Sequence, residues 1–136
     1  MNVYVVLILI FLFLVFIFAL YAFAKSIFVK KLNSADMVYV KGHWADIMNN
    51  IDEDASKAIL DADKILDYVL ARHGFSGSLG EKLKTSAYKF SDLNGIWNAH
   101  KLRNKLAHEF EEADEDEVKK ALKQYKRAFK DLGVKF

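Results

Sequence analysis

The feature that most restricts this chain is an uninterrupted apolar run near its start. From Val3 to Ala24 the sequence holds no charged residue, no Gly and no Pro. A helix rises about 1.5 Å per residue, so the run would span about 33 Å, enough to cross a bilayer core of about 30 Å. Tyr4 and Tyr21 fall near its two ends, where aromatic residues favour the membrane interface. We therefore expect residues 1–24 to form a transmembrane anchor.

The charges beside this run predict its orientation. No Lys or Arg precedes it, whereas Lys25, Lys30 and Lys31 follow it. Such charges stay in the cytoplasm, so we expect a single-pass protein of the cell membrane with its N-terminus outside and the rest cytoplasmic. A cleaved signal peptide is the alternative, because Ala22 and Ala24 have the spacing of a cleavage site. Signal peptides, however, have a basic start and an apolar core of about 7–15 residues, so an anchor is favoured.

The rest of the chain has the composition of one small globular domain. All 20 Lys and Arg residues and all 18 Asp and Glu residues lie from Lys25 onward. The formal net charge of +2 gives no global attraction to nucleic acid, and we expect no DNA partner. The absence of Cys excludes disulfides, thiolate zinc sites and a cysteine nucleophile. We expect no metal or cofactor, since neither a metal-ligand motif nor a Gly-rich phosphate loop is present.

Apolar residues recur with a helical period from Trp44 onward, at positions 44, 47, 48, 51, 55, 58, 59, 62, 65, 66, 69 and 70. Asn49, Asn50 and Asp52 interrupt the pattern, which predicts two helices, and Gly74 is expected to end the second. Residues 25–42 are expected to be a juxtamembrane connector. Within it, a short helix around residues 35–40 would be interrupted at Gly42.

Three more helices follow from capping signals and periodicity. A Ser-x-x-Glu sequence at 78–81 predicts a helix that runs to about residue 90. The next helix is expected over 91–108, and an Asp-x-x-Glu sequence at 114–117 begins the last one, which Gly133 ends. The fold class is therefore all-α, a transmembrane helix followed by an up-and-down bundle of four to five helices over residues 43–136. We expect these side chains to be mostly buried: Trp44, Ile47, Ile59, Ala62, Leu66, Val69, Leu83, Ile96, Leu106, Leu122, Tyr125 and Phe129.

The last helix carries acidic residues in its first turn and basic residues further along. This order complements the helix dipole, so we interpret the charges mainly as a solvated face. A partner-binding surface is the alternative interpretation.

The helix expected over 91–108 breaks its own pattern. On a helical wheel, the polar residues His100, Arg103 and Asn104 project into its apolar arc. Burying an Arg costs several kcal/mol unless it is paired. Asp63 is the best candidate partner because it borders the apolar stripe of its own helix. The polar group is either a structural network or a functional site, since such breaks concentrate at functional sites.

The same residues resemble a known family. Residues 103–108 read RNKLAH, which fits the pattern R-polar-x-x-x-H of HEPN domains (higher eukaryotes and prokaryotes nucleotide-binding). The segments AILDADKILDYVLARHG, SGSLGEKLK and WNAHKLRNKLAHE also resemble small bacterial HEPN-type proteins in that order, and the resemblance covers roughly residues 44–132. It implies a metal-independent endoribonuclease that acts as a homodimer. His108 would be the acid/base residue, Arg103 would stabilise phosphate charge and Asn104 would orient them, with His100 and Asp63 in support.

The leading hypothesis is thus a membrane-tethered HEPN-type ribonuclease with RNA as its substrate, acting as a toxin or stress effector. An antitoxin or membrane partner is not identified by the sequence. A non-catalytic HEPN-like module for dimerisation or for nucleotide or partner binding is the alternative, and a plain helical adaptor is the third hypothesis. Seven acidic residues between Glu109 and Glu117 would repel an RNA backbone, which weighs against catalysis.

Overall fold

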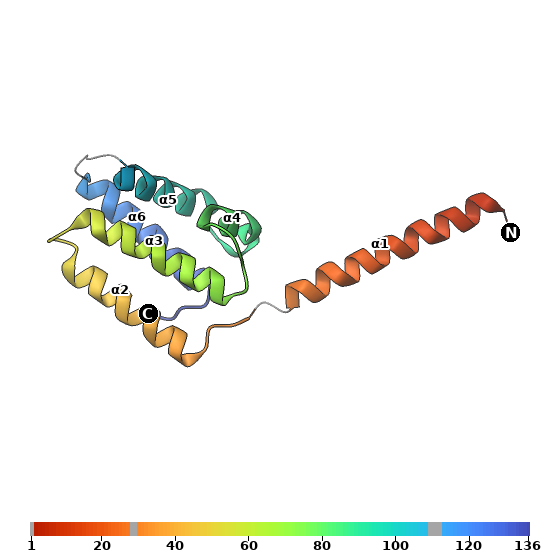
Figure 1. Cartoon of the computed structure of the whole chain (residues 1–136), viewed down its shortest axis with the longest axis horizontal. Coiled ribbons are helices and arrows are strands. Elements are labelled where there is room, and N and C mark those ends of the chain that lie inside the picture. The colour runs from red at the N-terminus through yellow and green to blue at the C-terminus, as the bar shows by residue number, and fades with distance from the viewer. Residues whose placement is uncertain (1, 28–29, 109–112) are drawn as a thin grey trace. The chain divides into compact units, whose positions relative to one another are not determined.

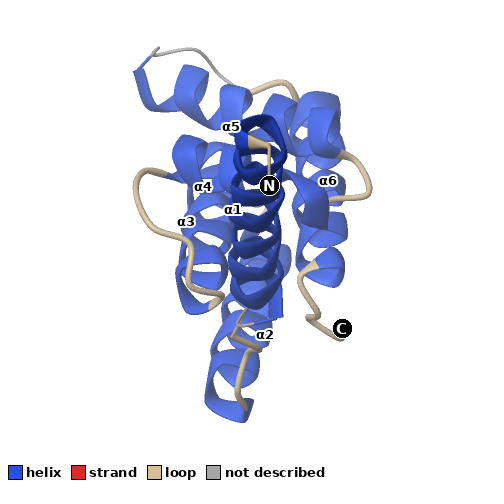
Figure 2. Ribbon diagram, turned by 90° about the vertical axis from the view of Figure 1, so that its right-hand side faces the viewer, coloured by secondary structure: helices blue, strands red, loops and turns tan. Residues whose placement is uncertain are grey.

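The computed structural model describes residues 2–27, 30–108 and 113–136. The chain divides into two units, Met1–Lys30 and Lys31–Phe136, and each is described by itself. Every regular element in the described ranges is helical (Figure 2). The all-α fold class predicted from the sequence is therefore confirmed.

The first unit is a single long helix, α1, which comprises Val3–Ile27 (Figure 1). The run Val3–Ala24 within it is long and apolar enough to cross a membrane, and none of it is buried in the protein. The side chains of this run are almost all exposed in the isolated chain, as the lipid-facing surface of a membrane span would be.

The second unit is a helical bundle. Its elements are α2 (Ser34–Asn50), α3 (Ala55–Arg72), α4 (Leu79–Thr85), the 3₁₀ turn η1 (Ala87–Lys89), α5 (Leu93–His108) and α6 (Glu115–Asp131). The central helix is α3, which packs against α2, α4, α5 and α6, while α5 and α6 also pack against each other (Figure 1). A residue on the buried face of α3 can therefore reach groups from several helices at once.

The expected helix boundaries follow local hydrogen bonds. Ser78 and Glu81 form the predicted reciprocal capping box at the start of α4. Asp114 accepts hydrogen bonds from two N–H groups in the first turn of α6. Gly74 and Gly133 have φ values of 94° and 90° just past α3 and α6, a conformation that disfavours residues with a Cβ.

The connector expected over residues 25–42 is wrong, because α2 already begins at Ser34. Asn33 Oδ1 accepts the N–H of Asp36 at 2.8 Å and Asp36 Oδ2 accepts the N–H of Asn33 at 3.1 Å, which closes a capping box. The helix then continues through Gly42, since Val40 and other side chains of α2 are buried against the bundle. The folded domain thus starts near residue 31, not at residue 43.

The helix predicted to reach about residue 90 is also shorter than expected. It ends at Thr85, and η1 follows. Ser86 is fully buried there, and its Oγ donates a hydrogen bond of 2.6 Å to the carbonyl oxygen of Lys82. A side chain that bonds the preceding turn competes with continued helix, which explains the early end.

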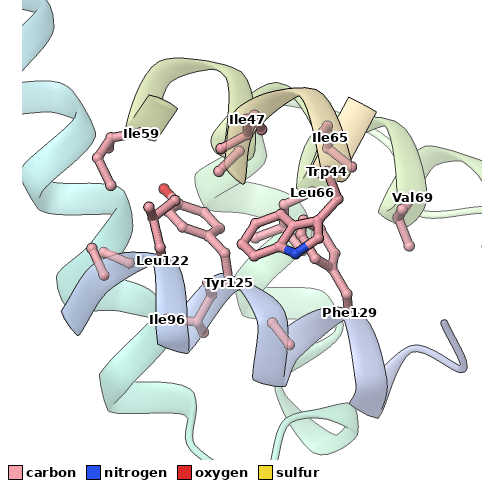
Figure 3. Packing of buried hydrophobic residues seen from close by; sticks show 14 of the residues in the cluster. Trp44, Ile47, Ile59, Ile65, Leu66, Val69, Ile96, Leu122, Tyr125 and Phe129 are labelled. Carbon is pink, nitrogen blue, oxygen red and sulfur yellow. The ribbon is translucent and has the colours of Figure 1, made fainter. Parts of the chain in front are cut away.

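In the described part of the second unit, the buried core residues lie between Val40 and Val134 (Figure 3). Its largest fully buried side chains include Tyr125, Phe129, Ile59 and Leu66. The predicted core residues are buried with one exception, Leu106, which is half-buried in the last turn of α5. Residues 31–136 therefore contain a hydrophobic core of their own, which is what a domain needs to fold alone.

Candidate functional site

Asp63 is the centre of a buried polar cluster. It lies on α3 and is only 5% exposed. Its Oδ1 accepts a hydrogen bond of 2.8 Å from the hydroxyl of Tyr125 on α6 and lies 2.9 Å from Nδ1 of His100 on α5. Its Oδ2 lies 3.3 Å from Nε of Arg103, also on α5. The predicted pairing of Arg103 with Asp63 is therefore confirmed.

These partners make the burial of Asp63 tolerable. A buried carboxylate is costly unless it is both paired and hydrogen-bonded. Asp63 follows the fully buried Ala62 on the inner face of α3, where α5 and α6 both pack. The cluster therefore joins three helices through one side chain, and it depends on the position of each.

The hydrogen bonds assign roles to Tyr125 and His100. Burial, and then the charge of Asp63, raise the pKa of Tyr125 far above its ordinary value, so its hydroxyl remains a donor. His100 Nε2 lies 3.4 Å from Nδ2 of Asn104. A neutral imidazole with hydrogen on Nδ1 would donate to Asp63 and accept from Asn104, which satisfies both contacts.

Arg103 is held by contacts with two side chains and is only partly buried. Its Nε is buried and lacks hydrogen-bond geometry toward Asp63, so their contact is an ion pair. Its Nη1 donates a hydrogen bond of 2.9 Å to Oδ1 of Asn104. The side chain as a whole is 32% exposed. The guanidinium therefore has a defined orientation, and about a third of the Arg103 side chain is exposed.

The structure thus brings together four of the five predicted site residues, namely Asp63, His100, Arg103 and Asn104. His108 does not join them: it is the last residue of α5 and is exposed, one helical turn beyond Asn104. The acidic residues 109, 111 and 112 lie outside the described residues.

Tyr125 is the member of the cluster that the sequence pattern missed. Its place in the apolar stripe of α6 predicts a core residue, and it is fully buried. Its hydroxyl was the available signal that it joins a polar cluster, because a buried Tyr hydroxyl usually forms a hydrogen bond with a polar partner. Asp63, on the buried face of α3, is that partner.

A second buried carboxylate, Asp36, joins α2 to α3 and was not expected either. It accepts a hydrogen bond of 2.8 Å from the hydroxyl of Tyr68 and pairs with Nε of Arg72 at 2.8 Å. Burial would raise the pKa of Asp36, but the hydrogen bonds from Tyr68 and from the N–H of Asn33, with Arg72, bring it below its ordinary value. This cluster caps a helix and ties it to the bundle, so a structural role accounts for it.

A hollow in the described part of the domain lies elsewhere, between α2 and α3. It has a volume of about 490 Å³, and residues such as Tyr39, His43, Asp46 and Lys57 line it. None of the five predicted site residues lines this hollow. The candidate site is therefore separate from this hollow.

Comparison of the chain with family models, with curated proteins and with solved structures finds no match.

Proposed function

We propose that α1 anchors a HEPN-like domain to a membrane and that this domain cleaves RNA through Arg103, Asn104 and His108. The observation that supports this is the arrangement of Arg103. A buried carboxylate and Asn104 orient its guanidinium, while a third of the side chain stays exposed. His108 is exposed on the same helix, one turn beyond Asn104.

This arrangement suits cleavage of a phosphodiester by its neighbouring 2′-hydroxyl. The hydroxyl oxygen attacks phosphorus, the bond to the 5′-oxygen breaks, and a cyclic phosphate and a free 5′-hydroxyl result. An imidazole such as that of His108 can take or give a proton near neutral pH. The oriented fork of Arg103 can bind the phosphate oxygens as charge develops on them. In a homodimer, two such motifs would face one phosphate.

A non-catalytic module is the second candidate. It is favoured by the fact that Asp63 already gives His100 and Arg103 partners inside the protein. In this case the cluster only holds α5 against α3 and α6, and the exposed end of α5 serves in dimerisation or in binding a partner.

A nuclease assay on residues 31–136 in buffer with EDTA separates the two candidates. We expect the unaltered domain to cleave single-stranded RNA, and His108→Ala and Arg103→Ala each to lower the rate about a hundredfold or more. His43→Ala is the matched control, because His43 is an exposed histidine on α2, away from the cluster. Absence of cleavage by the unaltered domain, with a strongly destabilised Arg103→Ala variant, would leave the non-catalytic module.

The membrane topology is part of the same proposal. Lys25, Lys30 and Lys31 beyond the apolar run support an N-terminus outside and a cytoplasmic domain. A reporter fused after Phe136 should be active only in the cytoplasm. A C-terminal tag that is accessible from outside intact cells would overturn this orientation. A role as a toxin or stress effector requires the cytoplasmic placement, since its RNA substrates are there.

A further inference from the structure

The outer face of α6 is entirely basic for three turns. Its inner face, which includes Val118, Tyr125 and Phe129, is buried in the core. Between Val118 and Lys130, every exposed side chain belongs to a Lys or an Arg. These residues are Lys119, Lys120, Lys123, Lys126, Arg127 and Lys130, and we call them the α6 basic face.

Most of these charges are not neutralised by the protein. Within the described part of the chain, Lys119 pairs with Glu115 at 3.5 Å and Arg127 pairs with Asp92 at 3.7 Å. The other four members of the α6 basic face have no acidic partner there, and the ammonium of Lys126 lies over the ring of Phe136 at 5.6 Å. Like charges one turn apart repel each other and destabilise a helix. The helix dipole and the two ion pairs account for only part of this concentration of charge, so the α6 basic face is available to an anionic partner outside the domain.

We propose that the α6 basic face binds the anionic headgroups of phospholipids in the membrane that holds α1. The proposal rests on the membrane anchor proposed above. Between the end of α1 and the start of α2 there are only six residues, 28–33, which can span at most about 20 Å. The domain must therefore stay close to the membrane surface, where lysines are attracted to anionic lipids.

The composition of the face favours lipid headgroups over RNA as its occupant. Binding of single-stranded RNA usually combines basic residues with exposed aromatic rings on which bases stack. The aromatic residues of α6, Tyr125 and Phe129, are both fully buried. Five of the six basic residues are Lys, which acts as a point charge, and only one is Arg, whose planar fork grips individual phosphates. Such a face suits a diffuse anionic surface.

Vesicle co-sedimentation of residues 31–136 tests the proposal without α1, so the result does not depend on whether the anchor inserts. We expect binding to vesicles of phosphatidylcholine with about one third phosphatidylglycerol, no binding to phosphatidylcholine alone, and release at high salt. Each lysine near an anionic surface strengthens partitioning about fivefold, so K123Q/K126Q/K130Q should weaken binding about a hundredfold.

The matched control is K41Q/K84Q/K101Q, which removes the same charge from three exposed lysines on other helices. It should keep most of the binding. Equal binding to both kinds of vesicle, no binding to either, or an equal loss in the two triple variants would overturn the proposal. Binding of poly-uridine but not of anionic vesicles, abolished by K123Q/K126Q/K130Q, would show that the occupant is RNA instead. Loss of the full chain from the membrane fraction of cells would instead contradict the anchor.

Discussion

Asp63 is a buried residue that stabilises the bundle and that, in the proposed function, also orients a phosphate-binding side chain. Its carboxylate accepts a hydrogen bond from the hydroxyl of Tyr125 in the interior. The same carboxylate contacts His100 and Arg103 on α5 and so fixes their orientation. The structural role and the proposed phosphate-binding role have different requirements. Stability requires only that the carboxylate be satisfied, whereas phosphate binding requires that Arg103 remain partly exposed, as it is.

Removal of Asp63 should be among the most destabilising changes in the domain. Asp63→Ala leaves Tyr125, His100 and Arg103 without their common partner, and we expect a loss of about 3–5 kcal/mol in the free energy of unfolding. Urea denaturation of residues 31–136 at neutral pH measures this loss. The control is Asp61→Ala, because Asp61 pairs only with exposed lysines, and it should cost less than about 1 kcal/mol. Equal losses in both variants would contradict a central role for the cluster.

Asp36 predicts a specific dependence of stability on pH. Its folded-state pKa lies below the ordinary value of 3.8, so the unfolded chain takes up the proton first as the pH falls. The contribution of Asp36 to the free energy of unfolding is therefore complete above the ordinary pKa of 3.8. It is lost as the pH falls through the lower folded-state pKa. The difference in unfolding free energy between the unaltered domain and Asp36→Asn should therefore be constant from pH 7 to about pH 5 and shrink below about pH 4. The matched control is Asp46→Asn, which removes a carboxylate from an exposed position on the same helix.

At the scale of the element, α2 shows why the connector prediction failed. Its inner face is narrow, with only Asp36, Val40, Trp44 and Ile47 buried, and one of these is a carboxylate. The apolar period is therefore too weak to reveal the helix before Trp44. The start of α2 depends on the capping box at Asn33 and on packing against α3. The packing against α3 also explains why the helix continues through Gly42.

Gly42 therefore offers an element-scale test. Nothing lies within 4 Å of a Cβ added at this position. Because Ala favours helix over Gly, Gly42→Ala should raise the free energy of unfolding by about 0.5–1 kcal/mol. The paired control, Gly133→Ala, should lower it, since Gly133 has a φ of 90° past the end of α6. Thermal melting of both variants checks this, and a loss of stability in Gly42→Ala would mean that residues 34–50 are not one helix in solution.

At the scale of the whole molecule, the proposed ribonuclease site would be a composite site, formed by residues from two copies of the domain. We expect residues 31–136 to form a dimer related by a two-fold axis, with Arg103, Asn104 and His108 lining a shared groove. Ala107 is exposed beside these residues, so Ala107→Arg should prevent association through steric and charge repulsion. Ala35→Arg makes the same change at an exposed position on α2 and should leave the dimer intact. Light scattering that gives a monomer for the unaltered domain at high concentration would count heavily against the composite site.

Much of this protein is determined by local signals in its sequence. The apolar run of α1, the capping box at Ser78 and the helical period of α3 act over one or two turns, so they can be recognised without knowledge of the fold. The polar break in α5 likewise identified His100, Arg103 and Asn104, and the need to pair a buried Arg identified Asp63. The resemblance of residues 103–108 to a family motif is also local, and it stays a prediction.

Only the tertiary structure decided how those side chains are partnered and exposed. Tyr125 joins Asp63 across 62 positions of sequence, and Asp36 receives Tyr68 across 32 positions. Arg103 stays partly exposed while its Nε is buried, and His108 lies past the cluster at the end of α5. These outcomes depend on where α3, α5 and α6 come together. A pattern read along one helix carries no information about which residue of another helix will face it, because that is set by packing.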